Sequence, residues 1–211
     1  MKKLTKQFST VIFAGMCVMG ISGCEDSGGD SHDFGTNDPN VIVAIGDSIT
    51  AQEGGNTTTY PAILASITGK TVINEGSGGA RTSDGVGKIQ SVLNDYKPGY
   101  VLILYGANDV ICSTGIDNAA ANLRSIIVTA KNNKTVPVIG TLTPMYYEHE
   151  IFDGGTHALN TLIRQIASEE GCAVADLESA FGDNTSYFKD DGLHPNDTGL
   201  SVIAEAFAGA L

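Results

Sequence analysis

The sequence has few of the residues that metal sites, redox cofactors or nucleic-acid surfaces require. It contains no Trp and only four Cys, none in CxxC spacing, and it has no HExxH, no phosphate-binding GxxxxGK[ST] motif and no complete GxGxxG. We therefore expect neither a metal nor another cofactor. Only 12 Lys and Arg stand against 24 Asp and Glu, for a formal net charge of −12. Such an acidic chain excludes nucleic acid as a partner.

Long hydrophobic runs are also absent. The apolar run at residues 11–21 is too short for a membrane-spanning helix, which takes about 20 residues. Three Lys precede this run, and two small residues, Ser22 and Gly23, follow it. A positive start, a short apolar stretch and a small-residue exit predict an export signal over residues 1–23.

Residues 21–24, Ile-Ser-Gly-Cys, resemble a bacterial lipobox, in which the Cys is lipidated and becomes the mature N-terminus. The resemblance implies that Cys24 carries the lipid, and that the protein is an exported lipoprotein on the periplasmic or cell-surface face of a membrane. Ordinary cleavage nearby, leaving a free Cys, is the alternative. We expect this N-terminal anchor to be the only membrane contact.

The rest of the chain divides in two by composition. Residues 24–40 are rich in Asp, Gly, Ser and Asn and have little to bury, so they predict a flexible acidic tether. Residues 41–211 alternate short apolar runs with amphipathic segments and predict one folded domain, which we expect to be a monomer.

Five apolar runs in this domain predict buried strands. They lie at residues 41–45, 71–73, 100–105, 136–141 and 173–177. Helices are expected between them, for example over residues 116–132, where apolar side chains recur at helical spacing. This alternation predicts a three-layer α/β/α sandwich around a five-stranded parallel sheet. In that fold Cys112 follows a strand and Cys172 precedes one, so we expect no disulfide between them.

Chemistry-bearing residues follow the first three predicted strands. Gly46-Asp47-Ser48 follows the first, residues 74–79 (Asn-Glu-Gly-Ser-Gly-Gly) the second, and Gly106-Ala107-Asn108-Asp109 the third. Asp191-Gly192-Leu193-His194 precedes the last helix. Sites in open parallel sheets form at the carboxyl ends of the strands. We therefore expect these segments to meet there.

In this order, the four segments resemble the four sequence blocks of the SGNH (GDSL-type) hydrolases. The resemblance spans residues 46–195, nearly the whole domain. Each block alone is common, but four in family order form a specific pattern. The resemblance implies a flavodoxin-like strand order and hydrolysis of an ester or thioester.

The residue types in these blocks suit acyl transfer. Ser48 is the candidate nucleophile, His194 its general base, and Asp191 the carboxylate that orients the imidazole. The backbone N–H groups of Ser48 and Gly79 and the side-chain amide of Asn108 are candidate oxyanion donors. Asp47 and Asp109 are interpreted as structural hydrogen-bonding groups that hold the loops.

Two segments are expected to border this site. Residues 143–156 form the longest irregular stretch after a strand, and Gln52 to Thr59 follow the nucleophile. Tyr146, Tyr147 and Phe152 either line the substrate surface or pack on the edge of the domain. The two His of this region, His149 and His157, are interpreted as loop residues.

The short domain leaves few residues for a lid or a deep acyl tunnel. The acidic side chains near the expected site, Glu53, Glu148, Glu150 and Asp153, disfavour anionic substrates. We therefore expect a serine esterase for short-chain acyl esters, including O-acetyl groups of carbohydrates. The alternatives are a non-catalytic ligand-binding lipoprotein on the same fold and a lysophospholipase- or thioesterase-type member of the family.

Overall fold

The computed structural model describes residues 32–51 and 55–211. The signal, Cys24 and most of the predicted tether lie outside the described residues. The folded unit extends from Asp33 to Leu211, so it begins before Val41, where the sequence pattern placed its start. Asn37 is fixed by a 2.7 Å hydrogen bond from its side-chain amide to the carbonyl of Asn133, and the first strand starts one residue later.

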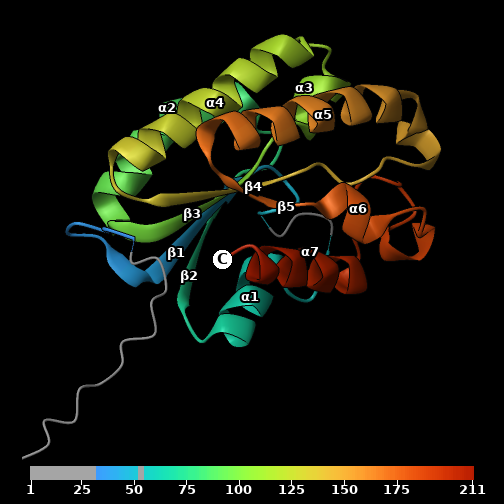
Figure 1. Cartoon of the computed structure of the whole chain (residues 1–211). Helices are drawn as coiled ribbons and strands as arrows, with labels where there is room; N and C mark the ends of the chain where they lie inside the picture. Colours follow the sequence, from blue (N-terminus) through green and yellow to red (C-terminus); the bar gives the residue numbers. More distant parts are fainter. Residues whose placement is uncertain (1–31, 52–54) are drawn as a thin grey trace, which may run out of the picture. The chain divides into compact units, whose positions relative to one another are not determined.

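The centre of this unit is a five-stranded, fully parallel sheet (Figure 1). Its strands are β1 (Asp38–Gly46), β2 (Thr71–Gly76), β3 (Pro98–Leu104), β4 (Val136–Gly140) and β5 (Ala173–Ala175). The spatial order is β2-β1-β3-β4-β5, which confirms the flavodoxin-like arrangement. Because β1 has β2 on one side and β3 on the other, the chain reverses direction across the sheet there, and a crevice forms beyond its carboxyl end.

Helices cover both faces of the sheet (Figure 1). One layer contains α2 (Thr82–Tyr96), α3 (Ala107–Ile111), α4 (Ile116–Asn132) and α5 (Asp153–Glu170). The other contains α1 (Tyr60–Thr68), α6 (Leu177–Phe181) and α7 (Asp197–Gly209). Two 3₁₀ helices, η1 (Tyr147–Phe152) and η2 (Thr185–Tyr187), lie in the connections. The predicted three-layer sandwich is confirmed.

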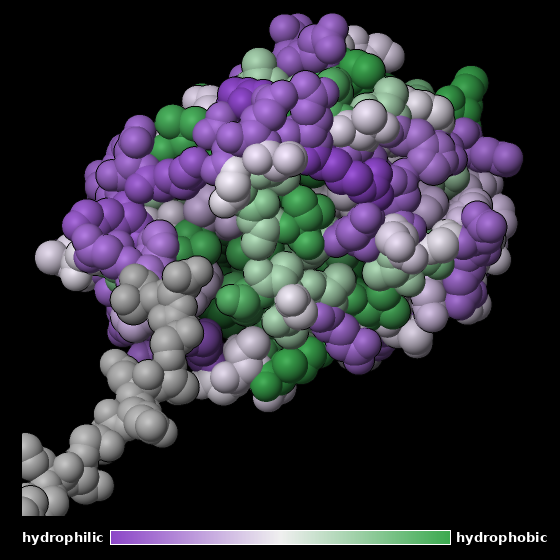
Figure 2. All heavy atoms as spheres, viewed as in Figure 1, coloured by the Kyte–Doolittle hydropathy of each residue, from purple (hydrophilic) through white to green (hydrophobic). Residues whose placement is uncertain are grey.

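The alternating direction of the side chains along β1 explains why helices must cover both faces of the sheet. Val43 and Ile45 point into the core cluster beneath α2, α4 and α5, whereas Ile42 and Ala44 point into the cluster beneath α1 and α7. All four side chains are fully buried. Figure 2 shows the outcome on one face: hydrophilic residues cover the upper helices, and hydrophobic residues gather between the two helical layers.

Both domain cysteines are free thiols. Cys112 is exposed after α3, whereas Cys172 is buried before β5. Burial raises the pKa of the Cys172 thiol to about 11, so this thiol is protonated at neutral pH.

The prediction of an irregular stretch over residues 143–156 is wrong from residue 147 onward. Residues 147–152 form η1, and α5 begins at Asp153, which places His157 in a helix. Gly154 and Gly155 disfavour helix formation, so helix propensity does not predict that α5 starts here. Gly155 is needed for packing, because a Cβ there would lie only 2.8 Å from Cγ1 of Val110.

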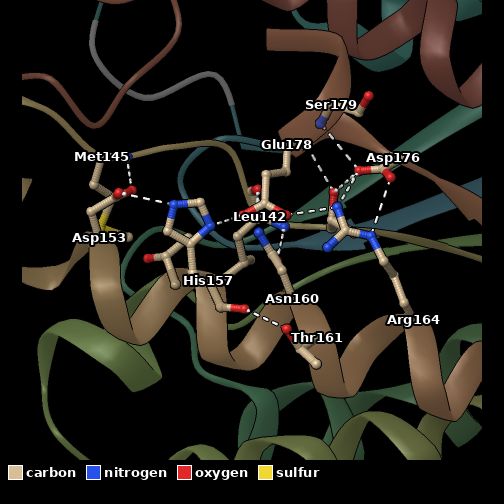
Figure 3. Close-up of polar contacts among 12 residues, drawn as sticks. Leu142, Met145, Asp153, His157, Asn160, Thr161, Arg164, Asp176, Glu178 and Ser179 are labelled. Carbon is tan, nitrogen blue, oxygen red and sulfur yellow. Dashed lines mark hydrogen bonds and ion pairs between the residues drawn. The ribbon is translucent and has the colours of Figure 1, made fainter. Parts of the chain in front are cut away.

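Polar side chains of α5 bind the segments that follow β4 and β5 (Figure 3). Asn160 is fully buried, and its side-chain amide makes two hydrogen bonds to the backbone of Leu142. The amide oxygen accepts the N–H of Leu142 at 2.7 Å, and the NH₂ group donates to the carbonyl of Leu142 at 3.0 Å. Arg164, one turn further along, pairs with Asp176 and Glu178 beyond β5. These contacts fix the chain as it leaves the sheet.

We expect Asn160→Ala to lower the free energy of unfolding by about 2–4 kcal/mol, because it leaves a buried N–H and a buried carbonyl without partners. Denaturant unfolding measures this. Thr161→Ala is the matched control: the neighbouring hydroxyl is exposed and bonds only within the helix, so its loss should change stability by less than about 0.5 kcal/mol. Equal effects for the two variants would contradict the role given to Asn160.

Candidate active site

Three side chains form one hydrogen-bonded line at the carboxyl end of β1. Oγ of Ser48 lies 2.9 Å from Nε2 of His194, although 146 positions separate them in the chain. Nδ1 of the same imidazole lies 2.7 Å from Oδ2 of Asp191. The structure therefore brings together the three residues that the sequence pattern selected.

A tight turn after β1 presents Ser48. The carboxylate of Asp47 is buried and accepts the N–H of Ile49 at 3.0 Å, while its backbone carbonyl accepts the N–H of Thr50 at 3.2 Å. A Cβ at Gly46 would collide with Oγ1 of Thr50, so only glycine permits this turn. Asp47 thus has the structural role expected of it, and Ser48 remains half-buried at the surface.

The loop of residues 191–194, called the His194 loop below, is held largely by its own carboxylate. Oδ1 of Asp191 accepts the N–H groups of Leu193 and His194, both at 2.9 Å. Burial alone would raise the pKa of Asp191, but the hydrogen bonds from the His194 backbone and ring and from Leu193 outweigh it and lower that pKa. Because the pKa is lowered, Asp191 stabilises the fold above the ordinary carboxyl pKa, and this contribution disappears as the pH falls through the lowered value.

Two candidate backbone donors follow the adjacent strands β1 and β2. The N–H groups of Ser48 and Gly79 have no hydrogen-bond partner among the described residues. Gly79 sits in a turn closed by a 3.1 Å hydrogen bond from Ala80 to Ser77, with φ at +69°. A Cβ at Gly79 would meet no protein atom within 4 Å, so its backbone faces open space. The conformation favours glycine, and the opening leaves room for a ligand.

The side chain of Asn108 links the third block to the second. Its NH₂ group donates to the carbonyl of Ala80 at 3.0 Å, beside Gly79. That bond uses one of the two N–H donors, so the second can serve a ligand. The neighbouring Asp109 is buried and binds Thr82 twice, through the backbone N–H at 2.9 Å and the hydroxyl at 2.7 Å. This is the structural role expected for Asp109.

Three aromatic residues expected near the site have different environments. Tyr146 is half-buried, donates its hydroxyl to the carbonyl of Gly182 at 3.0 Å and packs edge-on against Phe188. Phe152 is partly buried against the core. Tyr147 is 54% exposed, so of the three it alone presents a large apolar surface to solvent.

The segment after the nucleophile also reaches the site. Part of it, including Glu53, lies outside the described residues. The amide of Asn56 donates to the carbonyl of Pro195 at 3.1 Å, directly after His194. The hydroxyl of Thr57 donates to Asp197 at 2.8 Å, at the start of α7.

One contact of the His194 loop could not be predicted from the sequence. His149, interpreted there as a loop residue, lies in η1 with Nδ1 2.8 Å from the backbone carbonyl oxygen of Asp191. No periodicity or motif could have indicated it, because the contact joins two connections 42 positions apart. His157, also interpreted as a loop residue, lies instead in α5 and pairs with Asp153 and Glu178 (Figure 3).

A polar pocket of about 350 Å³ adjoins the turn of Gly79. It is lined by Ser77, Gly78, Gly79, Ala80, Asp84, Lys88 and Tyr105.

Within residues 32–51 and 55–211, no group of three or more His, Cys, Asp or Glu could hold a metal ion, and no helix is long and apolar enough to cross a membrane.

Comparison with known proteins identifies the protein family to which this chain belongs. The model of the GDSL-like lipase/acylhydrolase family matches residues 44–201. The chain is 27% identical over 154 residues to an acetylxylan esterase from Geobacillus stearothermophilus, covering 64% of this chain and 69% of that protein.

Solved structures share the fold. A G-D-S-L family protein from Desulfitobacterium hafniense superposes with a TM-score of 0.72 at 21% identity, covering 82% of this chain and 99% of that one. An acetylxylan esterase from Geobacillus stearothermophilus gives 0.71 at 22% identity, covering 81% and 93%.

The parallel sandwich and these matches together define an ester hydrolase with an α/β/α fold. The chain belongs to the GDSL-like lipase/acylhydrolase family, and its activity is that of a carboxylic ester hydrolase.

Proposed function

We propose that this protein is a serine esterase that removes short acyl groups, in particular O-acetyl groups of carbohydrates. The observation that carries the proposal is the line from Ser48 through His194 to Asp191, with separations of 2.9 and 2.7 Å. A serine hydroxyl is a weak nucleophile unless a base lies within hydrogen-bond reach, and the imidazole meets that condition.

The reaction proceeds in two halves. Oγ of Ser48 attacks the ester carbonyl carbon while Nε2 of His194 takes the hydroxyl proton, and Asp191 stabilises the imidazolium. The tetrahedral intermediate collapses, and the leaving alcohol takes the proton from His194, which leaves an acyl-enzyme. Water then attacks the acyl carbonyl with His194 again as base. Collapse releases the carboxylic acid and returns the proton to Ser48.

The negative charge on the tetrahedral oxygen needs donors that are already in place. The backbone N–H groups of Ser48 and Gly79 supply two, and the second amide N–H of Asn108 supplies a third. The bond from Asn108 to Ala80 fixes the amide next to the Gly79 turn, so these donors need little reorganisation during the reaction.

Ser48→Ala and His194→Ala should each lower kcat by about 10⁴–10⁶, because the residues act as one unit. Asp191→Asn should cost less than either, because part of the imidazole orientation persists. Hydrolysis of p-nitrophenyl acetate measures all three, and Ser66→Ala, an exposed serine on α1, is the matched control. Substantial turnover by the Ser48→Ala variant would rule out this mechanism.

Two features support a small, neutral substrate. Glu148 and Glu150 of η1 lie on the segment that borders the His194 loop, and their charge disfavours anionic esters. The acetylxylan esterase relative acts, by its name, on an acetylated polysaccharide, which supports the acetyl preference.

With p-nitrophenyl esters of increasing chain length, we expect kcat/KM to be highest for acetate and to fall by octanoate. Acetate release from acetylated xylan, measured alongside, tests the carbohydrate. A preference for octanoate would instead indicate a lysophospholipase- or thioesterase-type member. Good turnover of p-nitrophenyl acetate with no acetate release from any acetylated glycan would support the esterase activity and contradict the carbohydrate substrate.

We also propose that the enzyme works in the bacterial cell envelope, attached to a membrane by a lipid on Cys24. The support is the lipobox-like sequence of residues 21–24 behind a short apolar run. One acyl chain binds membranes only marginally, so stable attachment needs more than one.

In a bacterial host that lipidates exported proteins, the parent should fractionate with membranes and the Cys24→Ser variant should be soluble. Cys172→Ser, which changes a buried thiol far along the chain, is the control and should fractionate like the parent. Identical fractionation of the parent and the Cys24→Ser variant would show that lipidation is not the anchor.

A further inference from the structure

We infer that His149 is a positioning residue for the reaction, acting through the backbone of Asp191; the inference rests on the proposed Ser48-His194-Asp191 mechanism. Nδ1 of His149 lies 2.8 Å from the Asp191 carbonyl oxygen. A carbonyl can only accept, so Nδ1 must carry a proton and donate it. The bond therefore fixes the residue that orients the imidazole of His194.

A second hydrogen bond from the same segment holds the next carbonyl. The backbone N–H of Tyr146 donates to Gly192 at 2.9 Å. Gly192 has φ at +68°, and a Cβ there would collide with the carbonyl of Tyr146. The two segments thus lie against each other without room for a side chain, and two successive carbonyls of the His194 loop depend on residues 146–149.

Asp191 is consequently held from two directions. Its carboxylate binds the N–H groups of Leu193 and His194 and the ring of His194, all within its own loop. The hydrogen bond from His149 is a side-chain contact that connects this loop to η1, beside the packing of Leu193 against Met145 and Ala107. Without it the internal hydrogen bonds can persist while the whole loop shifts relative to Ser48.

The position of His149 is itself well defined. Its N–H donates to the carbonyl of Tyr146 at 3.0 Å, and its ring packs at 6.3 Å from that of Phe152. Before it, the N–H of Met145 donates to Asp153 at 2.9 Å, which fixes the start of the segment to α5. The half-buried imidazole is therefore presented to Asp191 by a folded turn.

The test is steady-state hydrolysis of p-nitrophenyl acetate by the full chain. His149→Ala should lower kcat by about 5- to 20-fold with KM nearly unchanged, the effect of losing one orienting hydrogen bond. His149→Asn, which places an amide donor near the position of Nδ1, should restore most of the rate. His157→Ala is the matched control, because His157 contacts Asp153 and Glu178 but not the His194 loop, and its kcat should equal that of the parent.

A double variant separates positioning through Asp191 from a general structural effect. In an Asp191→Asn background the further loss caused by His149→Ala should shrink, because the carboxylate that His149 positions is already absent. Circular dichroism establishes that each variant is folded. A full additional loss in that background, equal losses for the Ala and Asn variants of His149, or no loss in His149→Ala would each overturn the inference.

A spectroscopic measurement distinguishes failure of the inference about His149 from failure of the proposed function. The proton between Nδ1 of His194 and Asp191 should give a low-field NMR signal, identified by its disappearance in His194→Ala. His149→Ala should shift or broaden that signal and His157→Ala should not, whether or not any tested ester is hydrolysed. An unchanged signal in His149→Ala would overturn the inference, whereas an inactive parent with the expected shift would count against the esterase alone.

Discussion

The close approach of β1 to β2 and β3 at their carboxyl ends is the constraint on which the site depends. Gly46 pairs with Gly76 on one side and Leu104 on the other. A Cβ at Gly46 would meet the carbonyl of Leu104 at 2.6 Å, and one at Gly76 would collide with the backbone of Ala51. Because neither position has room for a side chain, the turns that carry Ser48 and Gly79 leave the sheet next to each other. The hydroxyl and the backbone donors then converge without help from flexible side chains.

Buried polar bonds extend this rigid part of the site outward. The amide of Asn74 donates to the carbonyl of Thr50 at 2.7 Å, which joins the second block to the first. Asp109 binds Thr82, and Asn122 of α4 donates to the same hydroxyl at 3.0 Å, which joins the third block to two helices. A buried carboxylate is tolerated there because each of its oxygens is hydrogen-bonded. These groups therefore serve the geometry of the site rather than its chemistry.

The features that sequence could predict are those with a local cause. Composition predicts the apolar strands β1 and β3, and the helical spacing of apolar residues predicts α4. The bounds of α4 were predicted correctly at Ile116–Asn132. The start of α5 was not, because Gly154 and Gly155 oppose helix formation in isolation and are used for close packing. The extension of β1 back to Asp38 was missed because exposed Asp, Pro and Asn resemble tether residues. The contact of His149 with Asp191 has no local signature, since two connections meet only after the sheet and α5 are in place.

The two halves of the site thus differ in what holds them. Ser48, Gly79 and Asn108 follow strands and inherit the rigidity of the sheet. Asp191 and His194 follow no strand: their loop lies between η2 and α7 and is fixed by its own carboxylate and by residues 146–149. Only a few hydrogen bonds join these partly buried connections, so we expect small changes in η1 to move the imidazole without unfolding the domain. On the proposed mechanism, we therefore expect the distance from Ser48 to His194 to be more sensitive to the sequence of η1 than the fold is. The catalytic rate would then vary through η1 while the sheet and the proposed oxyanion donors stay the same.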